Sequence, residues 1–351
     1  MSTVATENGV SVSHVDPHVS GAWRHLADEL SESHLAHSPE WATVIHEAYG
    51  HVPLYLAAVD AEGGAGLLPA FIVRRPLFGT VVTSMPFLDG GGPCGSSVAV
   101  ADALVARLMT EARVIGADVV ELRCFRRLNI DAHPMEHKVN LTLSLPVDAD
   151  RVWRQLDASV RNKVRKAEKS GLTIDVGGAE HLTAFYEVFA ARMRDLGSPV
   201  HAPRFLRAVL QSFGDRARIV LVRKDRTPVG GLVALAFKDI VAIPWASCLK
   251  EYLPLGPNAL LYWEAIRTAC AQGARRFDFG RSSRGSGTYR FKQQWGALET
   301  PLFWYTIPVG RRRISSSGHG RAAACVTELW RHLPLTATRC LGPKIRKYLI
   351  Q

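Results

Sequence analysis

Residues 219–237 read Ile-Val-Leu-Val-Arg-Lys-Asp-Arg-Thr-Pro-Val-Gly-Gly-Leu-Val-Ala-Leu-Ala-Phe. Two apolar runs flank a polar turn at residues 224–228, which is the pattern of a β-hairpin. The first half of the chain holds a second stretch of this kind, residues 55–73, with its polar turn at residues 60–64. In both stretches a Gly-Leu step opens the second apolar run. Two hairpins of one design in one chain indicate an internal repeat.

The same elements surround both hairpins. Helical patterns precede each hairpin, and a further strand, a loop with proline and glycine, a helix of period 3.6 and a strand introduced by Gly-Ala follow it. In the first half these segments are residues 21–30, 39–49, 81–83, 98–114 and 116–123; in the second half they are residues 151–169, 181–196, 203–213, 241–245, 258–271 and 273–280. This order of elements resembles that of an acyl-CoA N-acyltransferase (GNAT-like) domain.

The repeat predicts an α/β protein of two tandem GNAT-like domains with mixed, largely antiparallel sheets. We expect domain 1 at residues 1–140 and domain 2, the catalytic one, at residues 141–309, with the join near residues 134–150. A basic, partly helical tail follows at residues 310–351. A chain of 351 residues is long enough to form two cores of ordinary size.

The formal net charge of +11 is distributed unevenly. Residues 311–351 hold nine Lys or Arg and one acid, Glu328, whereas the other 310 residues hold 34 basic and 31 acidic groups. The body of the protein is therefore nearly balanced, which argues against broad coating of a nucleic acid and leaves local anion binding. In the tail, basic groups alternate with Trp330, Leu333, Tyr348 and Ile350, as in segments that bind anionic membranes; a loosely ordered solubilising tail fits equally well.

Other composition features narrow the class of protein. No apolar run approaches the roughly 20 residues of a membrane span, and the first residues lack an export signal, so we expect a cytoplasmic protein, peripheral at the inner membrane face if the tail binds lipid. The six cysteines are scattered and the histidines show no ligand spacing such as HExxH. We therefore expect no metal site and no tightly bound cofactor.

Residues 277–297 read Phe-Asp-Phe-Gly-Arg-Ser-Ser-Arg-Gly-Ser-Gly-Thr-Tyr-Arg-Phe-Lys-Gln-Gln-Trp-Gly-Ala, which is the main candidate site. A strand runs into a Gly/Ser loop with arginines, and a short aromatic helix with Lys292 follows. Such a loop can bind a polyanion beside a reacting carbonyl group, although it could equally be a solvated connection. Asp278 is a candidate general base, or else it pairs with an arginine or caps the Ser282-Ser283 turn. The candidate binding residues of this segment are Arg281, Ser282, Arg284, Tyr289 and Phe291.

The helix predicted at residues 151–169 is rich in cations. Arg161, Arg165 and Lys169 follow at a spacing of four and share one face, and Asn162 and Lys166 form a second row. A stripe of one sign can bind the phosphates of tRNA, CoA or a lipid-linked sugar. The alternative is an exposed amphipathic helix that turns its apolar residues inward.

Two loops are candidate phosphate sites. Gly256-Pro257-Asn258 opens a helix whose N-terminal amides could bind a pyrophosphate, although the sequence lacks the glycine-rich form of such a loop and a plain helix start fits as well. Residues 85–94 contain three consecutive glycines and form either a phosphate nest or a tight loop. Three aromatic residues could line an acceptor groove or belong to the core, namely Trp245, Tyr262 and Tyr289.

Three stretches resemble the FemAB-like family of tandem-GNAT transferases, which attach amino acids from aminoacyl-tRNA to peptidoglycan precursors. The similarity is most specific to FemAB-related proteins of PEP-CTERM/exosortase exopolysaccharide systems, with a BioF2-like acetyltransferase domain. The stretches are residues 160–171, 190–201 and 258–297, and His37-Ser-Pro-Glu-Trp41 is similar to the S-x-x-W opening of the first domain. The resemblance implies that Lys292 lies beside the ester that is aminolysed. Bridge-forming members place a basic residue just after S-x-x-W, where this chain has residues 42–45, Ala-Thr-Val-Ile.

The resemblance implies acyl or aminoacyl transfer to an amine or hydroxyl of a cell-envelope or exopolysaccharide precursor. The co-substrate would be aminoacyl-tRNA or acyl-CoA, and the acceptor a small molecule or a lipid-linked glycan. No Cys or Ser lies in a recognisable nucleophile elbow, so we expect direct attack in a ternary complex. Two alternatives stay open: an acyl-CoA-dependent N-acetyltransferase, and a non-catalytic tandem-GNAT scaffold that binds glycans or proteins during exopolysaccharide assembly.

Overall fold

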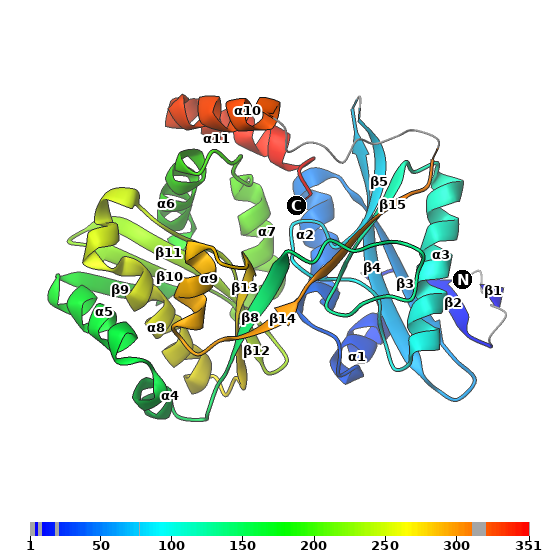
Figure 1. The fold of residues 1–351 in the computed structure, drawn as a ribbon, viewed down its shortest axis with the longest axis horizontal. Coiled ribbons are helices and arrows are strands. Elements are labelled where there is room, and N and C mark those ends of the chain that lie inside the picture. The colour runs from blue at the N-terminus through cyan, green and yellow to red at the C-terminus, as the bar shows by residue number, and fades with distance from the viewer. Residues whose placement is uncertain (1–3, 6–8, 18–20, 77, 311–320, 351) are drawn as a thin grey trace. The chain divides into compact units, whose positions relative to one another are not determined.

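The computed structural model describes residues 4–5, 9–17, 21–76, 78–310 and 321–350. The chain divides into two compact units. Unit 1 contains residues 1–139, 300–316 and 350–351, and unit 2 contains residues 140–299 and 317–349. Each unit holds one mixed sheet with helices against it (Figure 1). The chain thus has the two tandem GNAT-like domains that the internal repeat predicts.

Unit 1 contains an eight-stranded sheet in the order β1-β2-β3-β4-β5-β7-β15, with β6 paired to β4. The strands are β1 (Val4–Ala5), β2 (Ser11–His14), β3 (Val52–Val59), β4 (Ala65–Arg75), β5 (Gly79–Ser84), β6 (Cys94–Gly95), β7 (Val119–Cys124) and β15 (Phe303–Pro308). Only the β5–β7 pair is parallel. The helix α3 (Val98–Ile115) packs on this sheet through Leu104 and Leu108, in one apolar core with β3, β4 and β7. The elements α1 (Gly21–Glu29), η1 (Leu35–His37) and α2 (Glu40–Tyr49) contact β3 and β4.

Unit 2 contains a seven-stranded sheet in the order β14-β8-β13-β12-β11-β10-β9. The strands are β8 (Lys138–Ser144), β9 (Leu172–Gly177), β10 (Ala217–Lys224), β11 (Thr227–Phe237), β12 (Ile240–Cys248), β13 (Arg276–Ser283) and β14 (Leu298–Pro301). The hairpin of residues 219–237 is β10–β11, and its antiparallel register confirms the prediction. The pair β12–β13 is parallel, like β5–β7 in unit 1.

Helices cover both faces of the sheet in unit 2. They are α4 (Ala149–Gln155), α5 (Ala158–Lys169), α6 (Leu182–Asp195), α7 (Pro203–Phe213), α8 (Pro257–Ala271), α9 (Gly287–Gln293), α10 (Arg321–His332) and α11 (Leu335–Arg346), with short 3₁₀ turns η2 (Ala179–His181), η3 (Gly214–Arg216) and η4 (Lys250–Leu255). A Cβ at Gly230 of β11 would meet Leu261 of α8, whereas one at Gly231 would meet Phe185 of α6. Because neighbouring strand residues point to opposite faces, α8 and α6 lie on opposite sides of the sheet.

β15 follows the second half of the chain but belongs to the sheet of unit 1, and β8 joins the sheet of unit 2 beside a strand far along the chain. β15 pairs antiparallel with β7, while β8 lies between β13 and β14. Two predicted boundaries therefore differ from the units found: residues 303–308, expected in domain 2, lie in unit 1, and residues 321–349, expected as a separate tail, lie in unit 2. A strand pattern shows that a segment pairs, but it does not show with which sheet.

The single helix predicted at residues 151–169 is wrong, because two helices occupy this stretch. α4 ends at Gln155, and Asp157 caps α5 by accepting a hydrogen bond from the backbone N–H of Ser159 at 2.7 Å. An N-cap aspartate has extended backbone angles, so it ends one helix and begins the next. The tail that was expected to be partly helical contains α10 and α11. The basic residues 311–313 and the linker at residues 315–320 lie outside the described residues.

Candidate functional site

The end of β13 is held by Lys292 of α9. Lys292 is only 7% exposed, and its Nζ donates to the backbone oxygens of Gly280 at 2.9 Å and of Arg281 at 2.8 Å. α9 is short and depends on its cap, since Ser286 Oγ accepts from the backbone N–H of Tyr289 at 3.1 Å. Gly280 has a positive φ of 73°, which turns the strand end and favours glycine. The ammonium group thus fixes two successive peptide groups.

Ser282 lies directly beyond these two carbonyl groups. Its side chain is 4% exposed, and its Oγ has no hydrogen-bond partner in the described part of the chain. A buried hydroxyl without a partner costs about 1–3 kcal/mol, so such an atom is expected where a ligand completes the hydrogen bond. Because a peptide group is planar, the hydrogen bond from Lys292 to the oxygen of Arg281 also fixes the direction of the Ser282 N–H.

Asp278 is the second candidate of β13. Its Oδ1 accepts from Asn140 Nδ2 and from the backbone N–H of Gly280, both at 2.8 Å. Asn140 belongs to β8 and is buried. The hydrogen bond from the Gly280 N–H to Asp278 caps a turn. The sequence suggested that Asp278 caps the Ser282-Ser283 turn, which lies two residues further on. Asp278 therefore shapes the strand end, whatever it does in catalysis, and the contribution of Asn140 was not predicted.

The arginine loop forms an exposed network. Arg284 pairs with Glu299 at 3.2 Å, and the hydroxyl of Tyr289 donates to Glu299 at 2.7 Å. The hydrogen bond from Tyr289, followed by the interaction with Arg284, lowers the pKa of Glu299. Gln293 Nε2 in turn donates to the hydroxyl of Tyr289 at 2.7 Å. Arg284 and Tyr289 thus have a common acidic partner at the outer rim of the candidate site.

The aromatic candidates occupy the core rather than a groove. Tyr262 is buried and stacks on Phe279 with ring centroids 5.3 Å apart, and Phe291 lies at the same distance. Burial raises the pKa of the Tyr262 hydroxyl. Trp245 is also buried and packs edge-on against Phe205. Of the two readings that the sequence leaves open, the structure favours core packing for Trp245 and Tyr262.

The cations of α5 separate into two groups. Arg161 Nη1 donates to backbone oxygens at the end of α4, the best at 2.9 Å from Leu156, and Arg165 lies 5.5 Å from the ring centroid of Trp153. These two arginines therefore fasten α4 to α5. Asn162 and Lys166 are exposed on the second predicted row.

Lys163 connects α5 to two other parts of the candidate site. Its Nζ donates to Gln294 Oε1, just after α9, at 2.7 Å. Its backbone oxygen lies 3.4 Å from where a Cβ of Gly256 would be. Gly256 adopts a φ of 80° and leaves α8 without a side-chain cap, with Pro257 in the first turn and Asn258 half-buried. Lys163 thus connects α5 to the start of α8 and to the segment just after α9.

The parallel pairing of β12 with β13 is short. It covers residues 240–242 and 276–278, whereas the two strands continue to Cys248 and Ser283. The buried Ser282 lies in the part of β13 beyond this pairing. In open α/β sheets ligands bind beyond the carboxyl ends of parallel strands.

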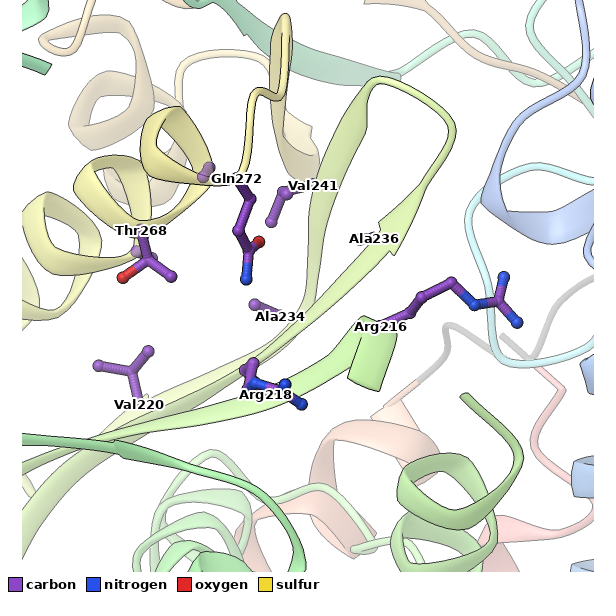
Figure 2. Close-up of a pocket in the computed structure, with 10 residues that line it drawn as sticks. Arg216, Arg218, Val220, Ala234, Ala236, Val241, Thr268 and Gln272 are labelled. Atoms are coloured by element: carbon purple, nitrogen blue, oxygen red, sulfur yellow. The ribbon is translucent and has the colours of Figure 1, made fainter. Parts of the chain in front are cut away.

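A separate small cavity lies at the other end of α8 (Figure 2). Thr268 of α8 and Gln272, the residue after α8, face Arg218 and Ala234 of the sheet. The room for the centre of a water-sized sphere is ≈ 10 Å³, which suits about one water molecule. None of the predicted site residues lines this cavity.

Among the described residues, no cluster of three or more His, Cys, Asp or Glu side chains could hold a metal ion. Within the same residues, no helix combines the length and the apolar character needed to span a bilayer.

Residues 154–293 match the family model described as an acetyltransferase (GNAT) domain. This range contains α5, β12, β13 and Lys292, so it covers the candidate site but less than half of the chain. No curated protein sequence matches the chain.

Several solved structures share the fold of nearly the whole chain. A structure of FemX is similar with a TM-score of 0.63 at 13% identity, covering 85% of this chain and 97% of that one. L-PGS from Bacillus licheniformis gives 0.55 at 13% identity, covering 92% and 96%. The C-terminal domain of a putative lysylphosphatidylglycerol synthetase from Agrobacterium fabrum gives 0.52 at 11% identity, covering 82% and 90%. These likenesses establish two GNAT-like units in one chain as a recurrent architecture.

Proposed function

We propose that the chain is a FemAB-type acyltransferase, with its reaction centre at the end of β13 in unit 2. The substrate would be an amine or hydroxyl of a cell-envelope or exopolysaccharide precursor. The match of residues 154–293 to the GNAT acetyltransferase domain carries the proposal, because it covers the elements that build the candidate site. The fold shared with FemX and with the synthetase named for lysylphosphatidylglycerol favours an aminoacyl donor and an envelope acceptor.

In this mechanism the acceptor attacks the donor carbonyl directly. The nitrogen or oxygen of the acceptor forms the new amide or ester bond, and the bond from the acyl carbon to the tRNA oxygen or the CoA sulfur breaks. The proton of the acceptor leaves with the released hydroxyl or thiol. Holding both substrates in one site supplies much of the acceleration.

Ser282 is the group that we assign to the reacting carbonyl. Its buried Oγ can donate to the acyl oxygen as negative charge develops there. Lys292 is then a positioning residue, since its two hydrogen bonds fix the peptide groups before Ser282. This role differs from the direct contact with the ester that the family resemblance implies. Asp278 would take up the acceptor proton, a role that its ties to Asn140 and Gly280 leave to experiment.

Donor phosphates would bind at the exposed row of α5. Asn162 and Lys166 lie there, and the uncapped start of α8 is linked to α5 through Lys163. Amides of a helix N-terminus attract phosphate, and cations add to the attraction. Arg281, Arg284 and Tyr289 would contact the donor or acceptor at the outer rim.

A donor screen tests the proposal. The full chain is incubated with aminoacyl-tRNA or acyl-CoA and with nucleotide-linked or lipid-linked sugar precursors, and acceptor mass is followed by mass spectrometry. We expect one acceptor to gain the mass of the aminoacyl group while uncharged tRNA accumulates. Transfer from CoA alone would instead support an N-acetyltransferase, with which the domain match is equally compatible. If no combination of donor and acceptor gave transfer, the proposed reaction would be wrong and the non-catalytic scaffold hypothesis would remain.

A further inference from the structure

Helices α10 and α11 form an outer layer on α6 (Figure 1). Their inner side is fixed by close packing. A Cβ at Gly342 would lie 3.1 Å from the backbone nitrogen of Val200, and one at Gly197 would lie 2.4 Å from Cγ2 of Thr327. Arg346 Nε donates to Nε2 of the buried His201 at 3.1 Å. The two helices therefore have a defined inner face, which also defines an outer one.

The outer face exposes large apolar side chains. Five of the fifteen such residues in the described part of the chain lie within residues 326–349. Their exposed fractions are 63% for Val326, 66% for Leu329, 44% for Leu341, 40% for Ile345 and 44% for Leu349. The spacing of three in α10 and four in α11 keeps neighbours on one side of each helix. Five exposed large apolar side chains within 24 residues are atypical of a surface that faces only water.

Cations accompany these apolar residues. The cations here include Arg331, Lys344 and Lys347, besides Arg346 on the inner side, and the one acid among residues 321–350, Glu328, pairs with Arg331 at 2.9 Å. Lys344 is exposed next to Ile345. The layer is thus amphipathic and carries a strong net positive charge.

We propose that the outer face of α10 and α11 binds an anionic lipid surface. Apolar side chains beside lysines suit the boundary between headgroups and acyl chains, where the lysine stems cross the boundary and the ammonium groups meet phosphates. A nucleic acid would match the charge but not the leucines. The inference does not depend on the proposed reaction, because it concerns binding alone.

Vesicle flotation tests the inference with the full chain. Vesicles of phosphatidylcholine with phosphatidylglycerol should bind the protein, and vesicles of pure phosphatidylcholine should bind it far less. Leu329→Ser combined with Ile345→Ser should lower the partition coefficient about tenfold or more, because two apolar side chains no longer enter the boundary. The matched control is Val114→Ser, which changes an 81% exposed residue of α3 in unit 1 and should bind like the unchanged chain.

The charge is tested separately. Lys344→Glu combined with Lys347→Glu should remove the preference for phosphatidylglycerol and its salt dependence. Circular dichroism should show both double variants folded, since the changed side chains lie outside the core. Equal binding of the unchanged chain to both vesicles, or unchanged binding by the apolar variant, would overturn the proposal. A concentration-dependent dimer that the apolar variant abolishes, without vesicle binding, would assign the face to a second copy.

Discussion

The ends of β7 and β13 occupy corresponding places in the two units, yet they are built differently. Each strand is paired in parallel with its neighbour over only three residues. In unit 1 the space beside β7 is filled by the glycine loop at residues 85–94. A Cβ at Gly92 would lie 2.4 Å from Cys124 Sγ, and one at Gly91 would lie 2.4 Å from Cβ of Met85. At Gly256 in unit 2 the nearest atom to a Cβ lies at 3.4 Å.

A cation holds backbone carbonyl groups at both strand ends. In unit 1 it is Arg123, which is 1% exposed and donates to the backbone oxygens of Leu88, at 2.7 Å, and of Ile350. In unit 2 it is Lys292, which comes from the helix after the strand and leaves Ser282 beyond it. Residues 85–94 could be a phosphate nest or a tight loop by sequence. The structure supports the tight loop. The comparison favours a structural end for β7, while the reactive end of β13 is our proposal.

The largest effect should come from breaking the structural end. Arg123→Met removes a buried charge 3.8 Å from Glu121, takes the side-chain donor from the oxygen of Leu88, and leaves the oxygen of Ile350 with the backbone N–H of Phe87. We expect the free energy of unfolding to fall by about 3–5 kcal/mol, measured by urea denaturation. The control is Arg113→Met, which changes an exposed arginine of α3 and should cost little. Equal losses in both variants would remove the special role of Arg123.

Lys292→Ala should affect both fold and turnover. Two half-buried carbonyl oxygens lose this donor, so the free energy of unfolding should fall by about 1–3 kcal/mol. Turnover of the folded enzyme should fall about 10²- to 10³-fold, because the peptide groups before Ser282 lose their fixed direction. Steady-state rates corrected for the folded fraction provide the measurement. Arg290→Ala, an exposed cation on the same helix, is the control. Full activity per folded molecule in Lys292→Ala would show that the end of β13 has a structural role only, like the end of β7.

Ser282→Ala separates chemistry from stability. The Oγ has no partner in the described chain, so its removal should leave the free energy of unfolding unchanged or slightly raised. Turnover should fall about 10- to 100-fold with little change in KM if the hydroxyl binds the developing oxyanion. The matched control in unit 1 is Thr83→Val, which removes another buried hydroxyl without a described partner and should leave turnover unchanged. The same rate for both variants would contradict the assignment of Ser282.

The sequence predicted the elements better than their partners. Hairpin periodicity located β3–β4 and β10–β11, because alternating apolar residues report local geometry. The pairing of β15 with β7 and the place of β8 beside β13 were not predicted, since pairing between distant strands leaves no local pattern. Similarly, the segment 277–297 indicated Lys292 and Asp278, but it could not show that Lys292 binds backbone oxygens or that Asn140 contacts Asp278. The sequence held one indication that Asn140 has a special role, namely its position as a polar residue between apolar Val139 and Leu141 in a strand.

The pH dependence of stability gives the smallest effect and concerns unit 2. His201 stacks on Phe205, and its Nε2 accepts a hydrogen bond from Arg346 Nε, so the folded state requires a neutral ring. Burial, and then the charge of Arg346, lowers the pKa of His201 well below 6.5. Below pH 6.5 the unfolded chain binds a proton that the folded chain excludes, so stability is complete above this pH and falls beneath it. We expect a loss of about 1 kcal/mol between pH 6.5 and 5.5 in urea titrations, because the unfolded ring is already half protonated at pH 6.5. His201→Gln should flatten this slope, and an identical slope in that variant would place the titrating group elsewhere.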